Sequence, residues 1–242
     1  MKKIDKLKAT LLLTILLTVK SKEAFAIDNE IIDLNVTKIG EPIFFDDIYN
    51  MLSTLPDGIK KYLLLNNLNI ILLENPYGAD LCWQNIYGQF YDTPIRGFTN
   101  VDGDNTTIYA EGSMHPGYYE TYYDISKNYT KKEFNCRMAK DTLFHELGHF
   151  FDSKTNFELS NSDTFNRFYD LEVNMFLNTS LYKIDNLGIY GNVSNVQEYF
   201  ASAYSCYISY PEELNEYCPL TYEYINYYME TLNDSYNKIL KK

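Results

Sequence analysis

The sequence predicts an α+β fold in which an N-terminal sheet lobe is followed by a C-terminal helical lobe. Before about residue 112, short apolar runs alternate with turn residues, which is the pattern of strands and short helices. After about residue 130, apolar residues recur at helical spacing almost to the end of the chain. One long helix at 131–153 stands between the two lobes, and we therefore expect a cleft between them near residue 150.

The N-terminal lobe is expected to hold two short helices and three strands. The helices are predicted at 44–55 and 59–66 from their apolar spacing. A buried strand at 69–73 ends at a turn that contains proline and glycine. Two further strands, at 96–100 and 106–110, flank a turn rich in Asp, Asn and Gly.

The C-terminal lobe is expected to be almost wholly helical. Ser162 is the predicted N-cap of a helix at 163–176, and Asn195 begins a helix that runs to about residue 209. Pro211 and Pro219 each stand where the first turn of a helix tolerates proline. A last helix, at 221–240, has apolar residues along one side.

The first 26 residues have the pattern of a secretory signal peptide. Four lysines precede an apolar run at 9–19, which is too short to span a bilayer. Ala-Phe-Ala at 24–26 matches the small-residue cleavage site. We therefore expect a secreted mature domain of residues 27–242.

The mature domain is strongly acidic. The formal charge of the whole chain is −12, and removal of the signal peptide, which carries six Lys and two acids, leaves −16. This charge argues against nucleic acid or an anionic membrane as a partner. It is compatible with a protein or peptide substrate, and we expect the domain to act as a monomer.

The long helix contains the motif H-E-x-x-H, formed by His145, Glu146 and His149. Residues i and i+4 share one face of a helix, so the two imidazoles can bind one zinc ion. Glu146 then lies beside the metal and is the expected general base that activates a water molecule. The alternative is a surface helix whose two histidines have structural partners, although apolar neighbours on both sides favour a half-buried helix.

A catalytic zinc site needs a third protein ligand. Thr155 occupies the position at which the extended H-E-x-x-H-x-x-G-x-x-H motif has its third histidine, which excludes that class. Glu158 follows the zinc helix too closely, so Glu172 and Glu198 are the remaining candidates. Glu198 is favoured because its helix neighbours are small or aromatic, and a carboxylate on such a face needs a partner.

The motif at 145–149 and the segment Glu-Tyr-Phe-Ala-Ser-Ala-Tyr at 198–204 together resemble one protease family. This family includes the zinc-protease domain of anthrax lethal factor and the small secreted Pro-Pro endopeptidases of clostridia, with the segment E-x-F-A-E-x-F. The resemblance implies a zincin-like fold, zinc bound by His145, His149 and Glu198, and hydrolysis of peptide bonds. Ser202 departs from the family, which often has an acid there.

The resemblance also implies an oxyanion donor and a substrate-binding strand. The family places a tyrosine about seven residues before the third ligand, and the nearest tyrosine here is Tyr190, one residue earlier. Tyr190 would donate to the tetrahedral oxyanion. Substrate would lie extended along an edge strand, which we expect to be 106–110.

Two functions from different classes are consistent with these features. The favoured one is a secreted zinc endopeptidase, and the alternative is a non-catalytic toxin-accessory or binding protein that retained the fold. Glu146 distinguishes them, because a structural zinc site needs no base and is closed by a fourth protein ligand.

Three further residue sets have two interpretations each. Asp152 could orient a metal ligand or be solvated at the end of its helix. His115 could line the cleft or have no role. Among the four cysteines, we expect Cys206 and Cys218 to form a disulfide, with free thiols as the alternative.

Overall fold

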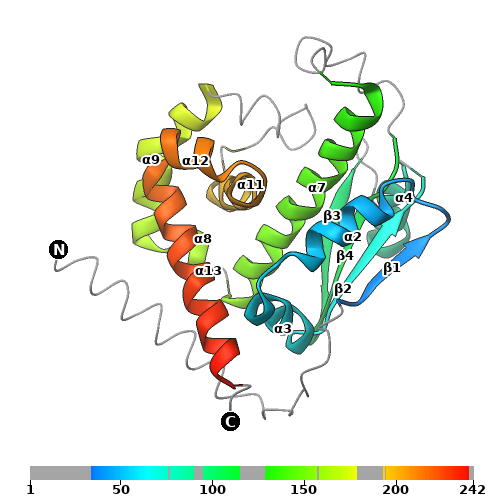
Figure 1. The fold of residues 1–242 in the computed structure, drawn as a ribbon, viewed down its shortest axis with the longest axis horizontal. Coiled ribbons are helices and arrows are strands. Elements are labelled where there is room, and N and C mark those ends of the chain that lie inside the picture. Colours follow the sequence, from blue (N-terminus) through cyan, green and yellow to red (C-terminus); the bar gives the residue numbers. More distant parts are fainter. Residues whose placement is uncertain are drawn as a thin grey trace.

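The computed structural model describes residues 34–75, 77–89, 95–114, 129–156, 158–178, 193 and 195–239. The predicted signal peptide lies outside this part of the chain. The described elements confirm an α+β fold with strands confined to the N-terminal half (Figure 1). In chain order they are β1 (Val36–Ile39), α2 (Phe45–Ser53), α3 (Asp57–Leu65), β2 (Leu68–Leu73), α4 (Gly78–Tyr87), β3 (Gly97–Asp102), β4 (Asn105–Glu111), α7 (Lys131–Lys154), α8 (Glu158–Asn161), α9 (Asp163–Asn178), α11 (Val196–Ser209), α12 (Pro211–Tyr217) and α13 (Pro219–Ile239).

The four strands form one mixed sheet in the order β1-β2-β4-β3. β1 and β4 are both parallel to β2, whereas β3 is antiparallel to β4 and is joined to it by a tight turn. Gly103 in that turn has a φ of 59°, which glycine adopts without strain. The expectation that 106–110 forms an edge strand is therefore wrong, because β4 pairs with β2 on one side and with β3 on the other. The edge strand of this hairpin is β3.

Helices cover both faces of the sheet. α7, α2 and α3 pack on one face through a core that includes Leu72 and Ile108, and α4 packs on the other face (Figure 1). The ring of Trp83 on α4 meets Phe98 on β3 edge to face, with centroids 5.2 Å apart. Neither α4 nor β1 was predicted. The turn residues before Gly78 obscure the start of α4, and β1 is too exposed to produce an apolar run.

Local hydrogen bonds explain where the central helices begin. α7 opens with a capping box, in which the Glu133 N–H donates to Thr130 Oγ1 and the Thr130 N–H donates to the Glu133 carboxylate. The predicted N-caps are confirmed, since Ser162 Oγ accepts from the Phe165 N–H at 3.1 Å and Asn195 Oδ1 accepts from the Gln197 N–H at 2.8 Å. No helix in the described part of the chain is long and apolar enough to cross a membrane.

The four cysteines are thiols, so the predicted Cys206–Cys218 disulfide is wrong. Both side chains are fully buried in the helical lobe. Cys218 Sγ is directed at the backbone oxygen of Glu172 on α9, 3.9 Å away. The short separation in sequence did not reveal this direction.

Candidate metal centre

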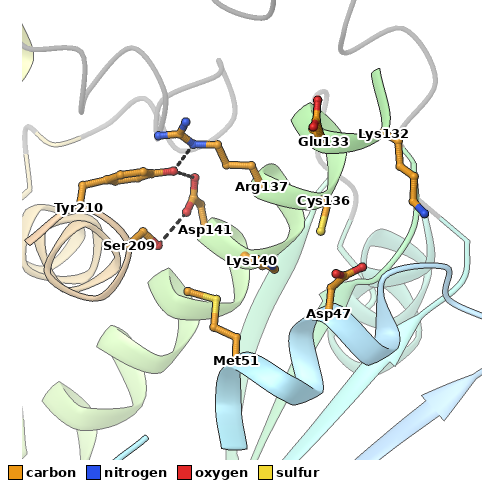
Figure 2. A pocket seen from close by; sticks show the side chains of 10 residues that line it. All are labelled: Asp47, Met51, Lys132, Glu133, Cys136, Arg137, Lys140, Asp141, Ser209 and Tyr210. Carbon is orange, nitrogen blue, oxygen red and sulfur yellow. Dashed lines mark hydrogen bonds between the residues drawn. The ribbon is translucent and has the colours of Figure 1, made fainter. Parts of the chain in front are cut away.

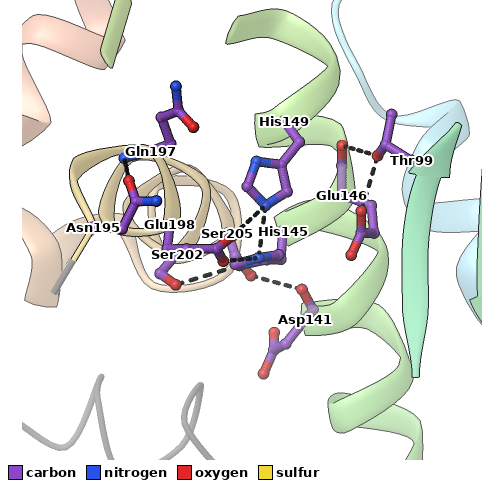
Figure 3. A network of polar contacts seen from close by, with 10 residues as sticks. All are labelled: Thr99, Asp141, His145, Glu146, His149, Asn195, Gln197, Glu198, Ser202 and Ser205. Atoms are coloured by element: carbon purple, nitrogen blue, oxygen red, sulfur yellow. Dashed lines mark hydrogen bonds and ion pairs between the residues drawn. The ribbon is translucent and has the colours of Figure 1, made fainter. Parts of the chain in front are cut away.

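Three side chains from two helices converge on one point (Figure 3). His145 and His149 lie one turn apart on α7, and Glu198 lies in the first turn of α11. The two Nε2 atoms are 3.1 Å apart. Glu198 Oε2 is 3.2 Å from His145 Nε2, and Glu198 Oε1 is 3.5 Å from His149 Nε2. The structure thus brings together the three residues that were predicted as metal ligands.

These separations fit a tetrahedral metal ion. Imidazole nitrogens and carboxylate oxygens bind zinc at about 2.0–2.2 Å, which places neighbouring ligand atoms of a tetrahedron about 3.3–3.6 Å apart. The observed separations of 3.1, 3.2 and 3.5 Å lie close to this range. The three residues could therefore hold a metal ion with little movement of their side chains.

The second nitrogen of His145 has its own partner. Ser202 Oγ, on α11, lies 3.3 Å from His145 Nδ1, and both side chains are buried. With Nδ1 protonated and donating to the serine, Nε2 keeps its lone pair for a metal. Ser202 therefore contacts a candidate metal ligand directly.

The charges of the site favour an ionised carboxylate. Burial by itself would raise the pKa of Glu198, but hydrogen bonds with His145 and His149 outweigh it and hold this pKa below its ordinary value. Burial likewise would lower the pKa of His149, but the hydrogen bond with Glu198 and the nearby charge of Glu146 raise it. These contacts favour the charged carboxylate of Glu198, which is the form that could bind a metal ion.

Glu146 stands beside this group but is not part of it. Its side chain is only 3% exposed, and its Oε2 accepts a hydrogen bond of 2.8 Å from Thr99 Oγ1 on β3 (Figure 3). Thr99 was not predicted as a site residue. Its role depends on which strand lies beside α7 and on which face of that strand it occupies, and the sequence pattern alone shows neither.

The competing acids have other partners. Glu172, the rival third ligand, accepts hydrogen bonds from the N–H groups of Leu220 and Thr221, at 2.8 and 2.9 Å, at the N-terminus of α13. Asp152 is buried, and its Oδ1 accepts from the Ser160 N–H at 3.0 Å, so it caps the following turn and is not solvated. Tyr190 and His115 lie outside the described residues, so the proposed oxyanion donor stays a prediction.

A network of hydrogen bonds extends from the candidate metal centre along α7 towards the N-terminus of this helix. Ser205 Oγ donates to the backbone oxygen of Asp141, and Ser209 Oγ and Tyr210 Oη donate to the Asp141 carboxylate at 3.0 and 3.1 Å. Arg137 donates in turn to Tyr210 Oη. Burial raises the pKa of Asp141 to about 6.

This network borders a pocket of about 580 Å³ (Figure 2). It lies beside the N-terminal half of α7 and mixes acidic, basic and apolar side chains. Its lining consists of Asp47, Met51, Lys132, Glu133, Cys136, Arg137, Lys140, Asp141, Ser209 and Tyr210.

No protein-family model matches the chain, and no curated protein matches it significantly. The functional interpretation therefore depends on the geometry of the site and on the motifs.

Proposed function

We propose that this chain is a secreted zinc-dependent endopeptidase with a zincin-like fold, similar to the lethal factor-like proteases. One observation carries the proposal. The two histidines of the motif and Glu198 converge to within ligand distances, while Glu146, the acid between the histidines, is held outside that group. This is the division of roles that a metalloprotease needs, with three ligands and one base.

The number of ligands supports a catalytic and not a structural ion. Structural zinc sites are closed by four protein ligands, whereas catalytic sites have three and leave a position for water or substrate. Among the described residues the candidate group contains His145, His149 and Glu198 and no fourth side chain. Two imidazoles and one carboxylate are a ligand set found in zinc proteases.

The residues of the chain have distinct roles in the proposed reaction. When bound, zinc supplies Lewis-acid chemistry, which polarises a carbonyl and lowers the pKa of water. Glu146 takes the proton of the attacking water and later delivers it to the leaving amine. Thr99 holds the Glu146 carboxylate against β3. Tyr190 is the proposed donor to the oxyanion.

The position of β3 supports a peptide as substrate. Among the described strands it lies at the edge of the sheet, and it is next to the helix that carries Glu146. An extended peptide can add to such an edge through main-chain hydrogen bonds, whatever its side chains. We therefore propose β3, and not β4, as the strand that binds substrate.

Cleavage profiling tests the function. The purified mature domain is loaded with zinc and incubated with a mixed peptide library, and new termini are identified by mass spectrometry. We expect cleavage that EDTA abolishes and added zinc restores. A folded, zinc-loaded protein that cleaves no peptide would instead favour the alternative of a non-catalytic binding protein.

A further inference from the structure

Two residues of β3, Gly97 and Thr99, contact the side chain of Glu146. Gly97 and Thr99 are two residues apart and therefore share one face of the strand. A Cβ on Gly97 would lie 3.2 Å from Glu146 Cγ and 2.8 Å from Thr142 Cγ2, so a larger residue would push against the glutamate. Thr99 Oγ1 then binds Glu146 Oε2 at 2.8 Å. Gly97 thus leaves room for the Glu146 side chain, and Thr99 binds its carboxylate.

The Thr99 hydroxyl contacts Glu146 at two points. Besides Oε2, it lies 3.0 Å from the backbone oxygen of Glu146. The hydroxyl has a single proton, which it donates to the nearer carboxylate oxygen or shares between the two acceptors, so one group on β3 contacts both the carboxylate and the main chain of Glu146. Because a glutamate side chain has several rotatable bonds, this contact removes freedom that a base aimed at one water molecule has to lose.

The backbone N–H and C=O of Thr99 point away from β4, towards the outer edge of β3. The Glu111 N–H donates to the Arg96 oxygen at 2.9 Å, and the register pairs Thr99 with Ile108. Bonded and non-bonded pairs alternate in an antiparallel ladder, so Thr99 belongs to a non-bonded pair. Its N–H and C=O therefore point outward, towards the position of an added strand.

We propose that Thr99 is a positioning residue that couples the pairing of an extended peptide with β3 to the orientation of Glu146. This inference rests on the proposed function and names one residue that links its two parts. A peptide that pairs with β3 restricts the motion of the main chain at Thr99. The hydroxyl of the same residue then restricts the orientation of the Glu146 carboxylate. The substrate class is an extended polypeptide recognised through its main chain.

The test compares isosteric variants of two threonines. Thr99→Val removes the hydroxyl and keeps the shape of a good strand residue, whereas Thr99→Ser keeps the hydroxyl. Thr106→Val is the matched control, because Thr106 is buried on the neighbouring strand β4 and its Oγ1 forms no hydrogen bond within the described residues. Cleavage of one peptide from the library is measured with zinc-loaded proteins, together with the zinc content of each.

We expect Thr99→Val to lower kcat about ten- to a hundredfold with KM within about twofold, since the base is displaced but the strand edge is intact. Thr99→Ser and Thr106→Val should stay within about threefold of the wild type on this scale. All variants should bind zinc as the wild type does. An unchanged kcat in Thr99→Val, or an equal loss in Thr106→Val, would overturn the inference.

The proposed function and this inference can fail separately. Absence of cleavage by the zinc-loaded wild type counts against the function. In that case a crystal structure of zinc-loaded Thr99→Val decides the inference, because the Glu146 carboxylate should leave its place against β3. A carboxylate that stays there would show that Thr99 does not position it.

Discussion

Gly148 packs so closely against Ala201 that a Cβ at position 148 would lie 2.7 Å from the Ala201 Cα and 3.1 Å from its backbone oxygen. Gly148 belongs to the H-E-x-x-H motif on α7, and Ala201 lies three residues after Glu198 on α11. The distance between the two helices at the candidate metal centre is therefore set by the absence of a side chain at position 148. This packing brings Glu198 within reach of both histidines.

Gly148→Ala should weaken zinc binding as well as stability. The added methyl group has to push α11 away from α7, at a cost of about 1–3 kcal/mol, and this moves Glu198 away from the histidine nitrogens. Zinc titration against a competing chelator and urea unfolding of the metal-free protein measure the two effects. Lys140→Ala on the same helix serves as control. Wild-type zinc affinity in Gly148→Ala would show that the close packing does not set the ligand geometry.

Glu146→Ala should bind zinc with little change but lose peptide cleavage. Glu146 is proposed as the base and lies outside the ligand group, so its removal leaves His145, His149 and Glu198 in place. Metal analysis and cleavage assays on the same preparation measure both properties. Loss of stoichiometric zinc would assign Glu146 to the metal site, and near-wild-type turnover would remove its role as base.

Glu198→Ala should affect zinc binding, whereas Glu172→Ala should affect the free energy of unfolding. Glu198→Ala should lose zinc and activity together, because it removes one of three ligands. Glu172→Ala should keep zinc affinity but lower the free energy of unfolding by about 1–3 kcal/mol, because two N–H groups at the start of α13 lose their acceptor. Chelator competition and urea unfolding distinguish them. A variant of Glu172 that loses zinc specifically would contradict the assignment.

The convergence of the three candidate ligands could be predicted from the sequence because each residue depends on local spacing or on one unusual feature of the sequence. His145 and His149 are fixed by the period of a helix. Glu198 stood out as a charge among small and aromatic neighbours. The bounds of the long helix, predicted at 131–153 and observed at Lys131–Lys154, depend on capping residues and apolar spacing that are also local.

The features that the sequence did not reveal depend on long-range pairing. Whether β3 or β4 lies at the edge depends on which strand pairs with β2, and no turn residue encodes that choice. Thr99 reaches Glu146 across 47 positions of the chain. The directions of the Cys206 and Cys218 side chains likewise follow from helix packing, so an even cysteine count was not a sufficient guide.

Ser202→Ala should lower zinc affinity about ten- to a hundredfold, the usual effect of removing a hydrogen-bond partner of a metal-bound histidine. The serine hydroxyl is the observed partner of His145 Nδ1, and alanine cannot replace it. Ser205→Ala is the matched control, because Ser205 lies on the same buried face of α11 but binds the backbone oxygen of Asp141. Equal zinc affinity of the two variants would show that Ser202 does not orient the ligand.

The buried carboxyl of Asp141 should make the metal-free protein less stable as the pH rises from about 4 to 7. Burial raises its pKa from 3.8 to about 6, so between these values the folded chain binds the proton more tightly than the unfolded chain. The stabilisation from this proton is complete below pH 3.8 and is lost as the pH passes through about 6. The full effect is on the order of 3 kcal/mol.

Asp141→Asn removes this titration and retains an oxygen that can accept from Ser209 or Tyr210. Other titrating groups, including His149 and Glu198, are common to both proteins and cancel in the comparison. Urea unfolding at pH 4.5 and at pH 7 should therefore show that the wild type loses more stability than the variant. An equal loss in both proteins would mean that Asp141 is ionised throughout this range, with Arg137 compensating its burial.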